Sequence, residues 1–191
     1  MKHCSQVLVV LFSCLYAIGV LANNSWQPIA KQQLKQYLAP YQNLPVKGTF
    51  SQSKKLQFLT VPIRSSGEFS IDKQQAELLW QQHKPVQQQT KITPAGIYQQ
   101  NPGQSDFVKV VDDTVVSQLL LAVFTGDIAE QDWFLWQHNP AQAHCIKSDI
   151  LLAELSQFVQ SIKLCQQQDL TQIALSEKQV ETLIELTEYK E

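Results

Sequence analysis

The sequence lacks the residue clusters with which many proteins bind nucleic acids or metal ions. Its 191 residues include 15 lysines and arginines against 17 acidic residues, and the basic residues form no cluster. We therefore expect no nucleic-acid partner. Its histidines and cysteines show no close paired spacing such as Cys-x-x-Cys, so we predict no metal site. No internal repeat or flexible linker is visible, which favours one domain.

Long apolar runs are also scarce, because only residues 7–21 form one. This run follows Lys2 and ends in Val20-Leu21-Ala22, a pattern typical of a secretory signal peptide cleaved after Ala22. We predict a cleaved segment at residues 1–22 and a single mature domain at residues 23–191. The stretch Leu11-Phe12-Ser13-Cys14 offers an alternative, a lipid on Cys14, although the bulky Phe12 argues against that processing.

Few cysteines remain after cleavage, since Cys4 and Cys14 leave with the signal peptide. Cys145 and Cys165 form an even pair in an exported chain, and we predict a disulfide between them. A reactive thiol next to His144 is the alternative, and it would make the protein a hydrolase. Because nothing nearby supplies an acid to orient that histidine, we favour a structural disulfide.

The apolar pattern predicts an α+β fold. Alternation indicates half-buried antiparallel strands, first around Phe50 and Phe69 and then in short segments to residue 99. Helical spacing is visible at residues 26–38 and again at residues 115–124, where Gly126 ends the run. Further strands are predicted at 132–137, 158–164, 170–175 and 181–187. The result is one large antiparallel sheet crossed by two helices, whose aromatic residues either enclose a cavity or pack as a dry core.

Five stretches in order resemble the periplasmic outer-membrane lipoprotein carrier family (LolA-like proteins), over most of the mature chain. They are "VKGTFSQSKKL", "SSGEFSIDKQQAELLWQQHKP", "TKITPAGIY", "VSQLLLAVFTGD" and the closing pair "IKLCQQQDLTQIALSE" and "VETLIELTEYK". The resemblance implies a large curved antiparallel sheet that forms an unclosed β-barrel, with helices covering a hydrophobic cavity. It implies a non-enzymatic periplasmic carrier without cofactors, which takes acyl chains of a lipoprotein or lipid from the inner to the outer membrane.

The same resemblance implies the site and the partners. The partners would be the acylated cargo, an inner-membrane exporter and an outer-membrane acceptor, and we expect a monomer. Lys73 stands near the position at which the family carries an Arg-Pro pair for lid control. A lysine cannot reproduce the planar fork of donors that an arginine offers. This difference favours a divergent branch of the family, with other lipids or glycolipids as cargo. The alternative function is that of an outer-membrane-anchored lipid or lipoprotein receptor, or of a non-shuttling lipid-binding envelope module. The residues expected to line the cavity are Phe50, Phe69, Ile71, Leu78, Trp80, Leu119, Leu120, Val123, Phe124, Phe134 and Trp136.

Overall fold

The computed structural model describes residues 25–128 and 132–189, so the predicted signal peptide lies outside the described residues. Twelve strands of this part form one antiparallel sheet. The strands are β1 (Gln27–Pro28), β2 (Lys47–Leu56), β3 (Ile63–Asp72), β4 (Glu77–Lys84), β5 (Gln88–Thr93), β6 (Gly96–Gln100), β7 (Val108–Val111), β8 (Phe134–His138), β9 (Cys145–Ile150), β10 (Ser161–Gln167), β11 (Leu170–Ser176) and β12 (Val180–Glu188). The helical segments are α1 (Lys31–Leu38), η1 (Ala39–Tyr41), α2 (Thr114–Thr125), η2 (Pro140–Gln142) and α3 (Ala153–Ser156).

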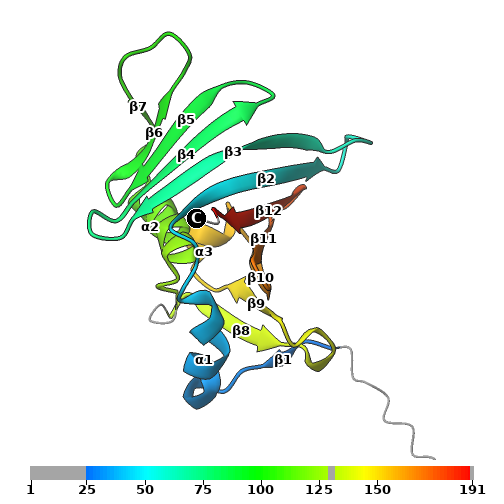
Figure 1. Ribbon diagram of the computed structural model, residues 1–191. Helices are drawn as coiled ribbons and strands as arrows, with labels where there is room; N and C mark the ends of the chain where they lie inside the picture. Colours follow the sequence, from blue (N-terminus) through cyan, green and yellow to red (C-terminus); the bar gives the residue numbers. More distant parts are fainter. Residues whose placement is uncertain (1–24, 129–131, 190–191) are drawn as a thin grey trace, which may run out of the picture.

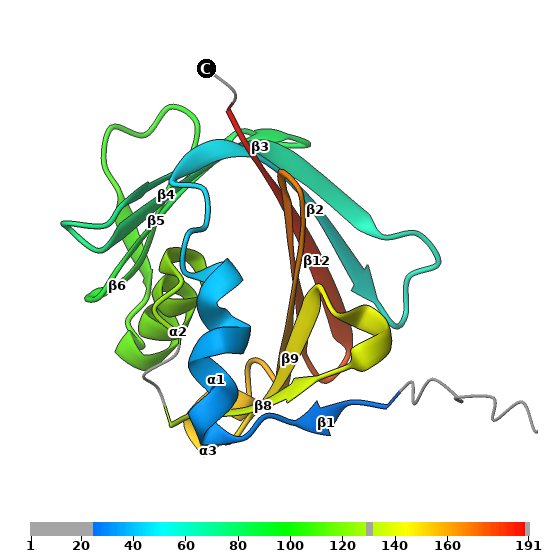
Figure 2. The same ribbon diagram turned by 60° about the horizontal axis from the view of Figure 1, so that its bottom comes forward.

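The sheet is strongly curved and does not close. Its strand order is β1-β8-β9-β10-β11-β12-β2-β3-β4-β5-β6-β7, so β1 and β7 are the two edges. Strands β2 to β7 form one wall and strands β8 to β12 form the other, with the bend where β12 pairs with β2 (Figure 1). Figure 2 shows α1 and α2 on the concave side of this sheet. The prediction of an α+β fold with a large antiparallel sheet is therefore confirmed.

Three local predictions were wrong or incomplete. The chain before α1 forms β1 rather than helix, because Gln27 and Pro28 pair with β8 and Ile29 N donates to Trp136 O at 2.9 Å. Strand β9 was not among the predicted strands, since its run "CIKSDI" is short and interrupted by charges. Strand β7 was also missed, because its four residues are too few to give a clear apolar pattern.

Helix α2 has well-defined ends and is apolar on nearly every side. At its start, Asp113 Oδ1 accepts hydrogen bonds from Val115 N at 2.9 Å and Val116 N at 3.2 Å, which satisfies two free N–H groups. At its end, Gly126 adopts a left-handed conformation with φ of 83° that a glycine tolerates. Buried positions recur along the whole helix, and a helix without a polar face is one that must be enclosed by protein.

The core lies between α2, α1 and the inner face of the sheet. Alternate residues of each strand face inward, and directly paired residues share a face, so the register assigns each side chain to one side. One inner row runs across the sheet from Trp136 through Ser148, Ile162, Leu175, Thr182 and Lys54 to Ile63.

Within the described residues, no helix has the length and apolar composition needed to cross a membrane.

Candidate functional site

All of the apolar residues predicted to line a cavity belong to one cluster on the concave side of the sheet. Most of them are buried, and only Trp80 and Leu120 are partly exposed. They come from both walls and from the helix between them. The members are Phe50, Phe69, Ile71, Leu78 and Trp80 from β2 to β4, Leu119, Leu120, Val123 and Phe124 from α2, and Phe134 and Trp136 from β8.

The centre of this cluster is an aromatic group around Trp80. The rings of Phe50 and Trp80 stack with centroids 3.7 Å apart, and Phe124 of α2 meets Trp80 edge-on at 5.6 Å. Phe69 lies 6.3 Å from the same indole. Phe50 and Trp80 are on β2 and β4, so their contact passes over β3, where Gly67 pairs with Phe50 and has no side chain to separate them.

A Cβ at Gly67 would meet the backbone oxygen of Gln81, because β3 and β4 approach each other closely here. Glycine at this position thus permits both the strand spacing and the aromatic stack. Our sequence interpretation did not single it out as part of the site. An isolated glycine inside an alternating strand pattern is the signal that would have indicated a close approach.

The second wall contributes a smaller aromatic pair and two buried polar groups. The rings of Phe134 and Trp136 lie 5.1 Å apart on β8. Trp136 Nε1 and Thr182 Oγ1 are both buried and have no hydrogen-bond partner among the described residues. Since Trp136 and Thr182 belong to the same inner row, both groups are on the face that carries the apolar cluster. Sequence reasoning predicted Trp136 only as an apolar residue and missed Thr182.

The apolar cluster is packed in this structure. Hollows elsewhere in the described part of the chain have other linings, and one of about 340 Å³ is lined mainly by glutamines between the β4–β5 turn and the β6–β7 loop. Two others, of about 820 Å³ and 520 Å³, share Ser53 and Leu183 on the outer face of the sheet. A hydrophobic cavity between α2 and the sheet is therefore not shown, and the side chains expected to line it contact one another instead.

Tyr41 connects the end of the first helical segment to the second wall. Its hydroxyl donates to His144 O at 2.8 Å and lies 3.2 Å from Leu164 O, and burial raises the pKa of Tyr41 to about 12. The backbone oxygen of Tyr41 also lies where a Cβ on Gly126 would be, so η1 and the end of α2 are in close contact. Tyr41 thus lies between the second wall and the C-terminal end of α2, and the sequence interpretation did not identify it.

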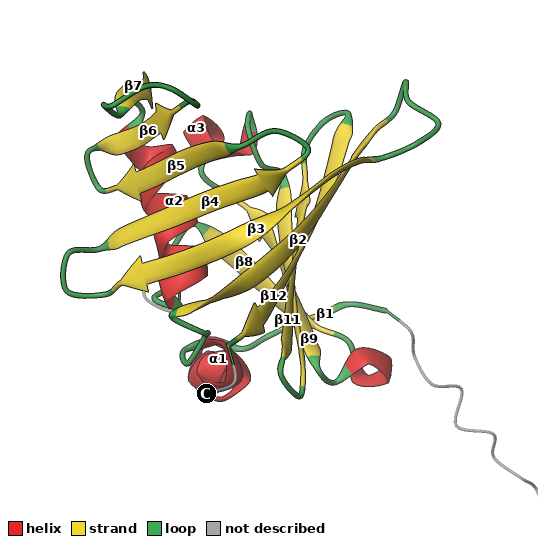
Figure 3. Ribbon diagram, turned by 45° about the horizontal axis from the view of Figure 1, so that its top comes forward, coloured by secondary structure: helices red, strands yellow, loops and turns green. Residues whose placement is uncertain are grey.

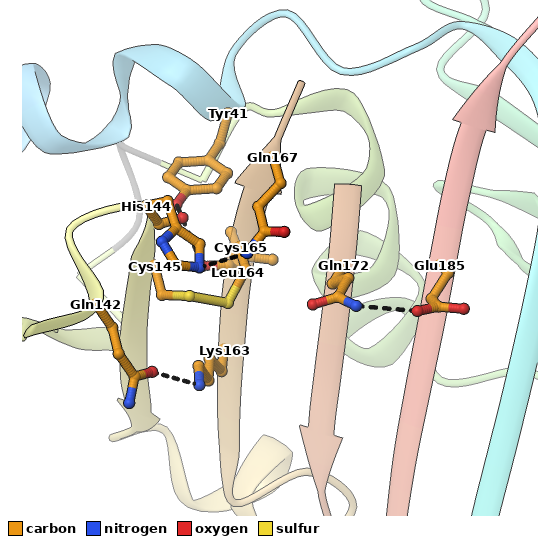
Figure 4. Close-up of a disulfide and its surroundings, with 10 residues drawn as sticks. All are labelled: Tyr41, Gln142, His144, Cys145, Lys163, Leu164, Cys165, Gln167, Gln172 and Glu185. Carbon is orange, nitrogen blue, oxygen red and sulfur yellow. Dashed lines mark hydrogen bonds between the residues drawn. A yellow bond between two sulfur atoms is a disulfide. The ribbon is translucent and has the colours of Figure 1, made fainter. Parts of the chain in front are cut away.

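Cys145 and Cys165 form a disulfide between β9 and β10, where they are directly paired across the two strands (Figure 4). Next to it, His144 Nε2 and Gln167 Nε2 are 2.8 Å apart. His144 has its ligand atoms within 4.8 Å of both sulfurs. Because the sulfurs are bonded to each other, neither is available as the thiolate that a metal ion or a nucleophilic mechanism needs.

Lys73 is exposed in the turn between β3 and β4. Asp72 builds this turn, since its Oδ1 accepts hydrogen bonds from Gln74 N at 2.9 Å and Gln75 N at 3.0 Å. Ala76 completes the turn with a positive φ of 49°. Lys73 is therefore not brought into the apolar cluster.

Comparison of the sequence with profiles of known protein families gave no match, and comparison with curated protein sequences gave no relative. The candidate site is thus described by its own geometry: an aromatic and aliphatic surface on the inside of an unclosed sheet, covered by one apolar helix.

Proposed function

We propose that this protein is a periplasmic carrier that binds acyl chains of a lipoprotein or a (glyco)lipid between α2 and the inner face of the sheet. One observation supports this function best, namely that a largely apolar helix covers an aromatic surface inside a sheet whose edges do not pair with each other. Because α2 is not part of the strand ladder, it is able to move away from the sheet without breaking strand pairing.

The chemistry of the inner surface suits an acyl chain. Burial of each methylene is worth about 0.8 kcal/mol, so ten methylenes supply about 8 kcal/mol toward displacing α2 from its contacts. The packed arrangement around Trp80 would be the empty state, in which the helix occupies the space that cargo takes when bound. This arrangement avoids an empty apolar cavity, which would forfeit the packing contacts of its lining. Cargo binding is then an exchange of helix contacts for lipid contacts.

The two unpartnered polar groups of the inner face fit the same function. Trp136 Nε1–H and the Thr182 hydroxyl are hydrogen-bond donors in a largely apolar surface, and burial without a partner costs free energy. The ester or amide carbonyl that joins an acyl chain to its headgroup is an acceptor of matching chemistry. We infer that a bound acyl group places a carbonyl against one of these donors.

The wider role follows from the carrier function. The cargo would be received from an inner-membrane exporter and passed to an outer-membrane acceptor, and Lys73 is the candidate for controlling the lid from the β3–β4 turn. Neither a cofactor nor a catalytic residue takes part. The alternative is a membrane-anchored receptor or a non-shuttling lipid-binding module with the same inner surface.

The test uses tryptophan quenching by fatty acids brominated along the chain. Trp80 lies in the proposed site, whereas Trp26 lines a hollow on the outer face, beneath the ammonium group of Lys163. We expect the brominated chain to quench wild type and the Trp26→Phe variant, and to quench the double variant Trp80→Phe/Trp136→Phe much less, since Trp136 also belongs to the proposed site. Absence of saturable quenching in the wild type, at probe concentrations below micelle formation, would refute an acyl site.

Mass spectrometry of the protein purified from cells then separates a carrier from a receptor. A carrier contains bound lipid, starts after the signal peptide and releases its lipid to added vesicles. A receptor carries an acylated Cys14 and stays in the membrane fraction.

A further inference from the structure

The loop between β2 and β3, residues 57–62, and the first residue of β3 form an unusually apolar tip. The exposed fractions are 72% for Phe58, 70% for Val61, 49% for Ile63 and 39% for Leu59. Within the described residues, no other stretch of this length has as many large exposed apolar side chains. Isolated exposed apolar residues are ordinary, but a contiguous group of them indicates a binding surface. We call this group the apolar tip.

The apolar tip is held in place by backbone hydrogen bonds. Leu59 N donates to Leu56 O at 3.0 Å, and Gln57 N donates to Gln179 O, in the β11–β12 turn, at 3.1 Å. Figures 1 and 3 show the loop at the free end of the long β2–β3 hairpin, where it projects beyond the rest of the sheet. The tip therefore presents its side chains on a convex projection and not in a groove.

Cations lie behind the tip on the same hairpin. Lys54 and Lys55 precede it on β2, and Arg64 follows it on β3. In an extended strand each residue advances about 3.3 Å, so Lys55, three residues from Phe58, lies at most about 10 Å behind it. Acidic residues are also present, because Glu181 pairs with Lys55 across β12 and β2 and Glu177 lies in the adjoining turn.

We propose that the apolar tip docks reversibly onto a membrane surface that contains anionic phospholipid. Apolar side chains of interfacial protein segments enter a bilayer by about 5–10 Å, with basic residues at the level of the headgroups. Phe58 and Val61 at the apex and Lys55 and Arg64 behind them match this depth profile. The convex shape also favours a deformable lipid surface over a protein partner, whose hot-spot pockets would have to enclose a projecting loop.

Docking at this tip would orient the molecule on the membrane. The inner face of β2 runs from Leu56 at the tip to Phe50 in the aromatic cluster, six residues or about 20 Å away. An acyl chain that leaves the bilayer beside the tip would meet this face directly. Docking nevertheless stands without the carrier function, because exposure and charge of the tip do not depend on what the interior binds.

The experiment is co-sedimentation of the purified, cargo-free exported protein with vesicles of phosphatidylcholine alone or mixed with phosphatidylglycerol. The wild type should partition at least tenfold more strongly onto the anionic vesicles, and added salt should reduce this difference. The double variant Phe58→Ser/Val61→Ser should lose at least tenfold in partitioning, with an unchanged melting temperature. The matched control is Val108→Ser/Val110→Ser, which removes two exposed valines from the edge strand β7 and should bind like wild type.

Failure of this proposal is distinguishable from failure of the proposed carrier function. The quenching assay contains no vesicles, and in the vesicle assay the tip variant leaves the interior cluster unchanged, so it separates docking by the tip from uptake of a phospholipid acyl chain. If the wild type does not partition onto anionic vesicles, or if the tip and control variants lose binding equally, membrane docking by the tip is wrong. A tip that instead binds a purified protein acceptor and leaves vesicles untouched would also overturn it.

Discussion

Replacement of Phe124 by alanine tests whether the interior is a ligand site or a permanent core. Phe124 is only 4% exposed and meets Trp80 edge-on from α2. Removing a buried phenylalanine side chain costs about 3–5 kcal/mol of unfolding free energy, because it loses apolar burial and leaves a cavity. That cavity would lie beside Trp80, in the space that we assign to cargo.

A ligand site and a permanent core differ in how added fatty acid changes the stability of Phe124→Ala. If the interior binds acyl chains, part of their space is already free in Phe124→Ala, so the variant should bind a fatty acid at least tenfold more tightly than wild type. A ligand at one hundred times its Kd adds about 2.7 kcal/mol to the stability, which offsets most of the loss. Urea denaturation with and without fatty acid measures both quantities.

Leu38→Ala is the matched control, because Leu38 is fully buried in α1 and outside the aromatic group. We expect it to lose about 2–5 kcal/mol as well, without any gain in fatty-acid affinity. The reasoning would be refuted if Phe124→Ala is destabilised as expected while fatty acid neither binds more tightly nor restores stability. In that case α2 covers a permanent hydrophobic core that binds no ligand. Phe124→Leu, a smaller change, serves the same purpose if the alanine variant does not fold.

Three further predictions concern the helix, the tyrosine and the disulfide. Leu120→Glu should retain most of its stability but lose bound lipid, because Leu120 is partly exposed and its replacement carboxylate reaches water. Leu119 is fully buried, so Leu119→Glu should fail to fold. Thermal melts and analysis of the bound lipid measure both outcomes. The pKa of Tyr41 is raised to about 12, so its contribution to stability is present below pH 10 and is lost as the pH rises toward 12. Between pH 10 and pH 12, the unfolding free energy of Tyr41→Phe should therefore fall less than that of wild type, by up to about 2–3 kcal/mol in urea denaturation. Equal pH dependence of the two proteins would contradict a raised pKa of Tyr41. Reduction of the Cys145–Cys165 disulfide, which spans 20 residues, should lower stability by about 3 kcal/mol, and an unchanged urea midpoint after verified reduction would show that the strand pairing alone holds β9 to β10.

Much of the local structure follows from short stretches of sequence. The run from Thr114 to Thr125 carries its own start signal in Asp113 and its own stop signal in Gly126, so the helix is predictable from neighbouring residues. Alternation around Phe50 and Phe69 likewise predicts both strands and their inward faces. Such signals depend on contacts within a few residues, and any structure that the chain forms has to satisfy them.

Other features were decided only by the tertiary structure. Phe50 stacks on Trp80 because the sheet order places β2, β3 and β4 side by side, with Gly67 on the strand over which the two rings meet. Tyr41 donates to the carbonyl of His144, 103 residues later in the chain. Likewise, the apolar loop containing Phe58 became a projecting tip only because the rest of the sheet ends before it (Figure 3). Apolar pattern specifies which side chains avoid water, but the partner that covers each one depends on strand order and curvature, which arise from the packing of the whole chain.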